Sequence, residues 1–392
     1  MRKHAVYDSA QENIDGELGV ATGINFREVW QETREQFGIP QDAAPTLNMI
    51  PRLATDPVGM TVYLDLNHWI GLAKARKAAN SSPTYDRCYE LLKAATSDRK
   101  VSMPLSSATY MELQHAVRSP RQRGDLADVM SELSRFVTIR RRSELIDAQF
   151  EAALNRRFGR PIYPRKLEAF GIGFNFAFEG VEKRMQIYMS DGVPARPADG
   201  AFFVFGYLAG ELTEYLMLRG PRDQDLSALA ATGYDRGPAL AVEQERLERE
   251  LRLAEDLRQD SRWLQRLDDV VWARELYWEI GPRLPELMGL AGMTEHAFFR
   301  YGKEWITEFL EDLPSVAVQQ QIRRQLFAKG SRPWKINDIR DLDALSLAIP
   351  YCDVVVTDKE AVGALTGNAG VERSGTVLLA RPEELLERLG EA

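Results

Sequence analysis

Short, mostly apolar runs alternate with amphipathic stretches in a region near the N-terminus of the chain. Residues 61–66 form such a run, rich in β-forming side chains, which is typical of a strand that is covered on both faces. A second strand is predicted at 101–105, and helices are predicted at 69–79, 85–95 and 109–117. Strands that alternate with helices in this way indicate a parallel α/β sheet.

The C-terminal region repeats this order of elements. Strands are predicted at 353–357 and 376–379, and helices are predicted at 338–349, 360–365 and 382–389. The last helix has a proline in its first turn, where the missing N–H has no partner within the helix. We therefore expect both regions to belong to one α/β domain.

The middle of the chain, from about residue 126 to residue 329, is predicted to be mostly helical and to interrupt that domain. The stretch 241–277 has apolar residues near helical spacing, with glutamate and arginine alternating at other positions. This alternation favours a solvated helix with ion pairs between residues four apart. The predicted segments are an N-terminal arm with one helix at 26–37 (1–58), the first half of the α/β domain (59–130), the helical insertion (131–330) and the second half of the domain (331–392).

Composition removes several classes of protein from consideration. The 392 residues include 50 Lys and Arg against 58 Asp and Glu, a formal net charge of −8, so a basic surface over the whole protein is not expected. Two cysteines and four histidines are too few or too scattered for a disulfide framework or a common zinc motif. Phosphate-binding glycine loops and serine-nucleophile motifs are missing. With neither a signal peptide nor a membrane span in the pattern, we expect a cytoplasmic protein without membrane contact.

Four carboxylates stand where α/β sheets usually carry function. Asp65 lies at the carboxyl end of the first strand, and Asp358 directly follows the strand at 353–357. Glu112 and Asp341 lie in the first turns of two predicted helices. Ligand sites in open parallel sheets form outside the carboxyl ends of the strands. Converging carboxylates repel one another unless a cation lies between them, and oxygen ligands suit Mg²⁺ or Mn²⁺.

Each of these acids also has a structural interpretation. Thr109 and Glu112 have the spacing of a capping box. Asp65 fits an N-cap or an Asx turn before the next helix. Asp358 fits a cap of the next helix. Asp338 and Asp341 fit the favourable negative charge at a helix N-terminus. The joint placement of four acids on this order of strands and helices favours a site.

Four segments of the sequence resemble the PIN-domain nucleases, and most closely a bacterial PIN-like branch with a PYCD…TD stretch. The resemblance covers about 60–130 and 330–392 and leaves the helical middle unexplained. VYLDLNHWI (62–70) corresponds to the family's opening strand with its first acid, and MPLSSATYMEL (103–113) corresponds to its second strand with the helix-borne glutamate. NDIRDLDAL (337–345) and PYCDVVVTD (350–358) correspond to its third and fourth acidic segments.

The resemblance implies a PIN-like three-layer fold around a central parallel sheet. It also implies hydrolysis of phosphodiester bonds by water, with Mg²⁺ or Mn²⁺ as the cofactor. Asn67 would orient a ligand or the scissile phosphate, and Asp338 and Thr357 would support the site. The acids that would bind the cation and take part in catalysis are Asp65, Glu112, Asp341 and Asp358.

The third acid is ambiguous in the sequence, since Asp338, Asp341 and Asp343 are all candidates. Residues three apart share one face of a helix, so Asp338 and Asp341 point together while Asp343 turns away. The interval from Asp341 to Thr357 matches the one usual in the family, and we select Asp341. The strand-end position favours Asp358 as the fourth acid. Two other acids remain open as its substitutes, Glu360 and Asp353.

Basic residues form clusters despite the net acidity. Clusters at 118–123 and 323–335 flank the predicted catalytic segments on both sides of the insertion, and Tyr163 and Trp334 are candidates for stacking on bases. A solvated helical face is the alternative for each cluster. The clusters predict a nucleic-acid groove with direct contacts from Arg323, Arg324 and Lys335.

These observations and the resemblance predict a metal-dependent endoribonuclease, with toxin or antiviral defence effector as the role that the resemblance implies. The alternatives are a DNA-directed nuclease with the same site and a non-catalytic PIN-like assembly module. The expected partners are a nucleic acid, RNA before DNA, an inhibitory protein and a second copy of the chain. A second copy is suggested by aromatic clusters at 174–178 and 202–205, which suit either the core of the insertion or a dimer surface.

Overall fold

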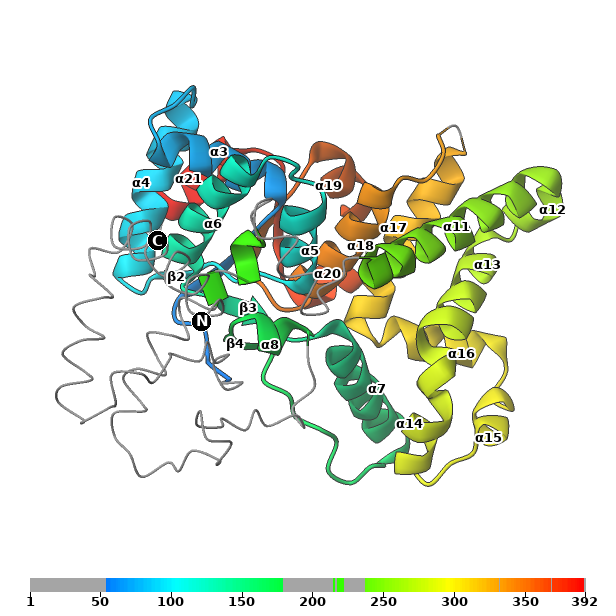
Figure 1. Ribbon diagram of the computed structural model, residues 1–392. Helices are drawn as coiled ribbons and strands as arrows, with labels where there is room; N and C mark the ends of the chain where they lie inside the picture. The colour runs from blue at the N-terminus through cyan, green and yellow to red at the C-terminus, as the bar shows by residue number, and fades with distance from the viewer. Residues whose placement is uncertain are drawn as a thin grey trace, which may run out of the picture. The chain divides into compact units, whose positions relative to one another are not determined.

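The computed structural model describes residues 54–178, 214–215, 217–221, 237–330, 332–367 and 369–390 (Figure 1). The helix predicted at 26–37 and the aromatic cluster at 202–205 lie outside these described residues. The chain divides into two compact units, one made of 1–51 and 182–217 and the other of 52–181 and 218–392. All the elements named below belong to the second unit.

A four-stranded parallel sheet in the order β2–β1–β5–β6 forms part of the core of this unit. Two regions far apart in the sequence therefore build one sheet, as predicted. Tyr63 of β1 and Val355 of β5 lie opposite each other and share a hydrophobic core with α17 and α18. Both strands are buried along most of their length, which explains the lack of alternation in the sequence. The strands are β1 (Met60–Leu64), β2 (Val101–Ser102), β5 (Val354–Val356) and β6 (Val377–Leu379).

The strand order creates a switch point between β1 and β5. The chain continues from β1 to β2 on one side and from β5 to β6 on the other side. Asp65 follows β1 directly, and Asp358 follows β5 after one intervening residue. Because ligands bind outside the carboxyl ends of parallel strands at such a point, the sheet marks this edge as the place to look for a site.

The described part of the segment 131–330 is mostly helical, as predicted, but it also contains two short strands, so the prediction of an all-helical insertion was wrong. β3 (Val137–Ile139) and β4 (Phe170–Ile172) pair in antiparallel fashion. Leu105 forms a parallel bridge to Thr138, so β3 adjoins the end of the strand predicted at 101–105. Strands of three residues contain too little periodicity to stand out in a sequence.

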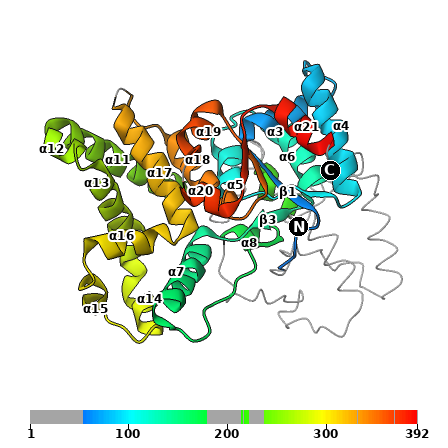
Figure 2. The ribbon, with the colours of Figure 1, turned by 180° about the vertical axis from the view of Figure 1, so that it is seen from behind.

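The helices predicted around the sheet are present, with their ends shifted by a few residues. Ser82 caps the predicted helix α4, and Ser119 caps α6, a further helix; they accept hydrogen bonds from the N–H groups of Tyr85 and Gln122, and a proline follows each cap. Figures 1 and 2 show α3, α4 and α21 grouped together and α17 beside α18. The helices are α3 (Leu66–Arg76), α4 (Pro83–Ser97), α5 (Ser107–His115), α6 (Pro120–Ser134), α18 (Ile336–Ala348), α19 (Lys359–Leu365), α20 (Ala369–Ser374) and α21 (Pro382–Gly390).

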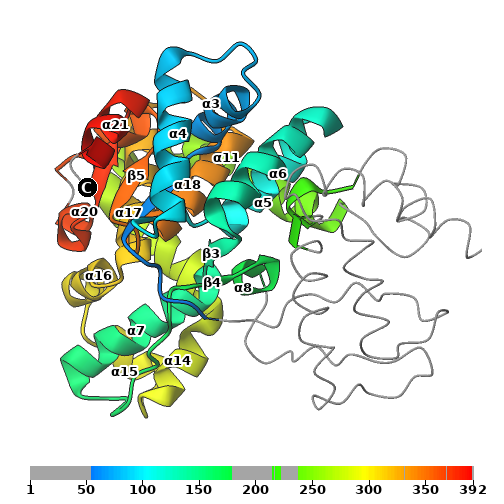
Figure 3. The same cartoon turned by 90° about the vertical axis from the view of Figure 1, so that its left-hand side faces the viewer.

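The middle region contributes further helices around a second core that contains Phe150, Phe298 and Phe309. Several of these helices lie apart from α3 and α4 (Figures 1 and 3). Instead of one helix over 241–277, the structure has a break after Gln259, where Asp260 caps the next turn. The elements are α7 (Arg142–Phe158), α8 (Phe174–Phe178), α11 (Gly237–Gln259), α12 (Ser261–Leu264), α13 (Leu267–Arg274), η2 (Glu275–Ile280), η3 (Gly281–Arg283), α14 (Leu284–Leu290), α15 (Glu295–Phe299), α16 (Lys303–Glu311) and α17 (Pro314–Lys329).

Of the aromatic residues of α8, Phe176 is buried in the core, and Phe174 and Phe178 are half-buried. Phe174 stacks on Phe178 at 4.3 Å, and Tyr110 of α5 contacts both rings edge-on. The first of the two predicted aromatic clusters thus belongs to the core. None of the helices in the described part of the chain combines the length and the apolar character that a membrane span requires.

Candidate metal centre

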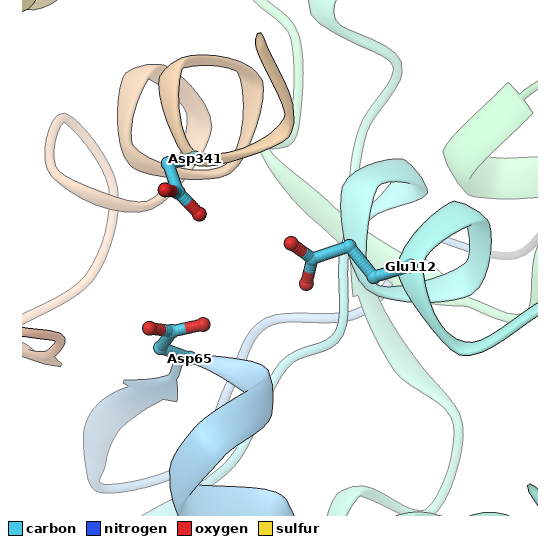
Figure 4. A group of neighbouring side chains, drawn as sticks. All are labelled: Asp65, Glu112 and Asp341. Atoms are coloured by element: carbon cyan, nitrogen blue, oxygen red, sulfur yellow. The ribbon is translucent and has the colours of Figure 1, made fainter. Parts of the chain in front are cut away.

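Three acids from three separate elements converge at the carboxyl end of β1 (Figure 4). Asp65 lies between β1 and α3, Glu112 lies on α5, and Asp341 lies on α18. Each residue offers a carboxylate oxygen, and these oxygens lie within 4.8 Å of one another. Figure 4 shows the three carboxylates directed toward a shared space. The structure therefore brings together three of the four acids predicted from the sequence.

The backbone places Asp65 where β1 ends. Its N–H donates to the carbonyl of Val356 at 3.0 Å, and its own carbonyl accepts from the N–H of His68 at 3.0 Å as α3 begins. Asp65 occupies the N-cap position of α3, but its side chain does not accept a capping hydrogen bond of normal geometry. Hydrogen bonds from the backbone N–H groups of Leu66 and Asn67 nevertheless lower the pKa of this carboxylate, so it retains contact with the start of α3 while it faces the cluster.

Hydroxyl groups fix the start of α5 against β1. Ser106 and Thr109 form a reciprocal capping box, with N···Oγ distances of 3.3 and 3.2 Å. The Tyr63 hydroxyl of β1 lies 2.9 Å from Ser106 Oγ and 3.1 Å from Thr109 Oγ1. The alternative that paired Thr109 with Glu112 in a capping box is wrong, because the helix begins three residues earlier. Glu112 thus lies one turn inside α5 and faces Asp65.

Ion pairs resolve which aspartate of α18 belongs to the site. Asp338 accepts two hydrogen bonds from Arg332, both of 2.8 Å. Asp343 accepts two from Arg246, of 2.5 and 2.7 Å, on another side of the helix. Asp341 is the aspartate that lies with Asp65 and Glu112, as predicted.

Asp358 has a capping role and also lies near the cluster. Its Oδ1 accepts from the N–H of Ala361 at 2.7 Å at the start of α19, so the capping interpretation holds. The carboxylate is exposed and is not one of the three whose oxygens lie within 4.8 Å of one another. Its negative charge nevertheless raises the pKa of both Asp65 and Asp341.

The two substitutes for Asp358 are engaged elsewhere. Asp353 precedes β5 at the opposite end of the strand, where Thr61 donates to it from the backbone N–H at 2.7 Å and from Oγ1 at 2.8 Å. Glu360 is exposed and pairs with Lys329 at 2.7 Å. These contacts favour Asp358 as the fourth acid near the cluster.

Burial and mutual repulsion raise the pKa of all three clustered acids. Burial is the largest cause for Glu112, and with the charges of Asp65 and Asp341 it raises the pKa to about 8. The pKa of Asp341 rises to about 7 through burial and the charges of Asp65, Asp358 and Asp338. Burial also raises the pKa of Asp65. When these crowded carboxylates ionise together, they repel one another. A divalent cation such as Mg²⁺ or Mn²⁺, which prefers oxygen ligands, would balance their charge.

The predicted supporting residues lie around the cluster. Asn67 is exposed on the first turn of α3, and a hydrogen bond from its side chain lowers the pKa of Asp65. Thr357 is buried, and its N–H donates to Leu379 at 3.0 Å between β5 and β6.

His68 was not singled out from the sequence, because a lone histidine carries no motif. It is buried, and its Nδ1 lies 3.0 Å from the Tyr85 hydroxyl. Burial lowers its pKa, although the nearby Thr357 carbonyl and the charge of Asp358 oppose the shift. His68 therefore places an uncharged ring beside the strand-end acids at neutral pH.

Arg323 was predicted to contact nucleic acid, and the structure contradicts this prediction. Its side chain is 0% exposed and forms ion pairs with Glu250 at 3.1 Å, with Glu279 at 3.3 Å and with Glu275. A buried arginine must be paired, and these three glutamates require a cation in return. Arg323 is a structural residue of the helical region.

The other basic and aromatic candidates differ in exposure. Lys335 is exposed at the start of α18, and Arg324 is partly exposed and paired with Asp268. Trp334 is only 6% exposed and packs against Phe327, so its predicted stacking on a base is wrong. Tyr163, by contrast, is 90% exposed. Burial therefore reduces the predicted contacts to Arg324, Lys335 and Tyr163.

No family model, curated protein or solved structure matches the chain. The interpretation of the acidic cluster therefore depends on the geometry and the chemistry of its own residues.

Proposed function

We propose that the protein is a metal-dependent nuclease that hydrolyses phosphodiester bonds, with RNA as its substrate. The observation that carries this proposal is the convergence of Asp65, Glu112 and Asp341, whose carboxylate oxygens lie within 4.8 Å of one another. They lie at the switch point of a parallel sheet, where such folds bind their ligands. The donor set consists of oxygen atoms only, which suits Mg²⁺ or Mn²⁺.

The three clustered acids would hold the cation, and the raised pKa values indicate how strongly they need a positive charge. A bound divalent ion would activate a water molecule and stabilise negative charge on the phosphate. Asp358 and Asn67 are exposed beside the cluster, where they would orient the water and the scissile phosphate. The carboxylates would otherwise repel the phosphate, so their charge must be balanced before a substrate binds.

The choice of RNA is supported by the resemblance of four sequence segments to PIN-domain nucleases. The α/β architecture with its parallel sheet is compatible with the PIN-like fold that this resemblance implies. Lys335 is exposed at the start of α18, the helix that carries the third acidic segment, and Lys359 is exposed at the start of α19, the helix that follows β5. They would contact the phosphates on either side of the scissile bond.

A cleavage assay with end-labelled single-stranded RNA, duplex RNA and DNA tests the proposal, with Mn²⁺, Mg²⁺ or EDTA present. We expect cleavage of RNA in the presence of Mn²⁺ or Mg²⁺, and no cleavage in EDTA. Asp65→Asn should lower the rate by about two orders of magnitude, the usual effect of removing a group that stabilises developing charge. Glu360→Gln is the matched control, since this exposed acid pairs with Lys329 outside the cluster.

Two results would contradict the proposal. Full Mn²⁺-dependent activity in Asp65→Asn would remove the acidic cluster from the reaction. Cleavage of DNA but not of RNA would support metal-dependent phosphodiester hydrolysis and contradict RNA as the substrate.

A further inference from the structure

Glu243 of α11 connects two helices that carry acids of the candidate site. Its carboxylate accepts hydrogen bonds of 3.2 and 2.8 Å from Arg340, and it lies 3.6 Å from Nδ1 of His115. Arg340 immediately precedes Asp341 on α18, and His115 lies almost one turn after Glu112 on α5. One buried carboxylate thus contacts both helices at positions next to their site residues.

The contact belongs to a row of charges on one face of α11. Residues 243, 246 and 250 are three and four positions apart, so they share that face. Arg246 binds Asp343 of α18, and Glu250 is buried between Arg274 and Arg323. The sequence predicted a solvated helix over this stretch. The prediction is wrong for the face that carries Glu243, Arg246 and Glu250. It is correct for the exposed face, where Glu245 pairs with Arg249.

Glu243 also determines what Arg340 contacts. Arg340 is buried, and it lies close enough to Glu112 to act on that carboxylate electrostatically. A buried guanidinium without its partner carries a large desolvation cost and seeks another carboxylate. Glu112 is an acid of the cation site whose carboxylate interacts electrostatically with Arg340. Pairing with Glu243 engages the guanidinium of Arg340, which is then not free to form an ion pair with Glu112.

We propose that Glu243 is a positioning residue for the acidic site. It holds α5 against α18 and keeps Arg340 from pairing with Glu112, so that Glu112 and Asp341 remain available to a divalent cation. The inference rests on the proposed function in one respect, namely that the acidic cluster binds such a cation. Through Glu243, the helical region that interrupts the α/β sequence determines the state of the site.

The test is calorimetric titration of the full chain with Mn²⁺, without nucleic acid. Glu243→Gln keeps the size of the side chain and removes its charge. We expect it to weaken Mn²⁺ binding by about tenfold, the lower range of effects for groups that orient metal ligands. Glu245→Gln is the matched control, since it makes the same change on the exposed face of the same helix and should leave Mn²⁺ affinity unchanged.

A double variant separates positioning from a general loss of structure. Removing Arg340 as well, in Glu243→Gln/Arg340→Met, eliminates the unpaired cation, so Mn²⁺ affinity should recover most of what the single variant loses. Removal of both partners also relieves the buried charge, so this protein tests the inference even where the single variant does not fold. If Glu243 served only to stabilise the fold, the single variant would bind Mn²⁺ as tightly as the unmodified protein wherever circular dichroism shows it to be folded.

The outcomes distinguish the inference from the proposed function. Mn²⁺ affinity in Glu243→Gln equal to that of the unmodified protein would overturn the inference alone. Failure of the double variant to bind Mn²⁺ better than the single variant would overturn the role assigned to Arg340. Mn²⁺ binding without RNA cleavage would contradict the proposed function and leave the inference standing, whereas no Mn²⁺ binding by the unmodified protein would contradict both.

Discussion

The N–H of Asp65 donates to the carbonyl of Val356 at 3.0 Å, and this hydrogen bond joins the two halves of the sheet at the candidate site. It lies directly after the paired stretch in which Leu64 is opposite Val356. Asp65 is therefore held at the carboxyl end of both strands, while Asp358 follows on the second strand. Any change in the pairing of β1 with β5 would move the first acid relative to the others.

Burial of the acids and repulsion among them predict an unusual dependence of stability on pH. Burial, with the charges of Asp65 and Asp341, raises the pKa of Glu112 to about 8 in the folded protein, against an ordinary value of 4.5. Between these values the folded state binds more protons than the unfolded state, so the free energy of unfolding falls as the pH rises. In EDTA, we expect the melting temperature to decrease from pH 5 toward pH 8.

Glu112→Gln should remove much of that decrease, because the amide cannot ionise. At pH 8 in EDTA the variant should melt higher than the unmodified protein, by about 1–2 °C for each kcal/mol that is no longer spent on burying and crowding the charge. At pH 5 the two proteins should melt alike, since Glu112 is then protonated. Differential scanning calorimetry across this range checks both statements, and equal melting temperatures at pH 8 would contradict them.

Cation binding should stabilise the protein through the same acids. A ligand at about a hundred times its dissociation constant stabilises a fold by about 2.7 kcal/mol. Mn²⁺ should therefore raise the melting temperature of the unmodified protein, and more at pH 8 than at pH 6, because the ligands must lose protons. Asp341→Asn should abolish the increase and Glu360→Gln should retain it; a full increase in Asp341→Asn would exclude that residue as a ligand.

Asp353 should matter for stability and not for the cation. It accepts two hydrogen bonds from Thr61, at the end of the strands opposite to the acidic cluster. Asp353→Ala should lower the free energy of unfolding by about 1–3 kcal/mol, because it leaves these donors without their partner. Urea denaturation measures this loss. A decrease in Mn²⁺ affinity in the folded variant would show instead that Asp353 contributes to the site.

Arg323 should stabilise the helical region without contacting a substrate. Arg323→Met leaves Glu250, Glu275 and Glu279 short of a buried cation, and we expect a loss of about 3–5 kcal/mol in the free energy of unfolding. Below its unfolding transition, the variant should bind RNA as the unmodified protein does. A selective loss of RNA affinity with unchanged stability would restore the original prediction of a nucleic-acid contact.

Lys335 is the most exposed of the three basic residues predicted to contact nucleic acid. Lys335→Glu should weaken RNA binding and lower the salt dependence of the binding constant by about one counterion. Fluorescence anisotropy at several salt concentrations measures both effects. Arg323→Met serves as the comparison, since it should leave the salt dependence unchanged.

The sequence by itself determined most of the elements around the sheet and named the three acids that converge in the structure. The strand at 61–66 and the strand at 353–357 were readable because strands covered on both faces are continuously apolar. Asp65 followed from its position at a strand end, which is a local property. Helix periodicity excluded Asp343 but left Asp338 and Asp341 together, and Asp341 was selected through the resemblance to PIN-domain nucleases. The short strands β3 and β4 were missed because three residues carry almost no periodicity.

Only the tertiary structure decided the role of each charged side chain. Arg323, Glu243 and Arg246 look like residues of solvated helices in the sequence, yet they are paired in the interior with partners from distant helices. Asp338 and Asp343 were distinguished from Asp341 by the arginines that bind them. The physical reason is that periodicity reports which face of a helix is covered, whereas the state of a charge depends on the groups that the fold brings within a few ångströms of it.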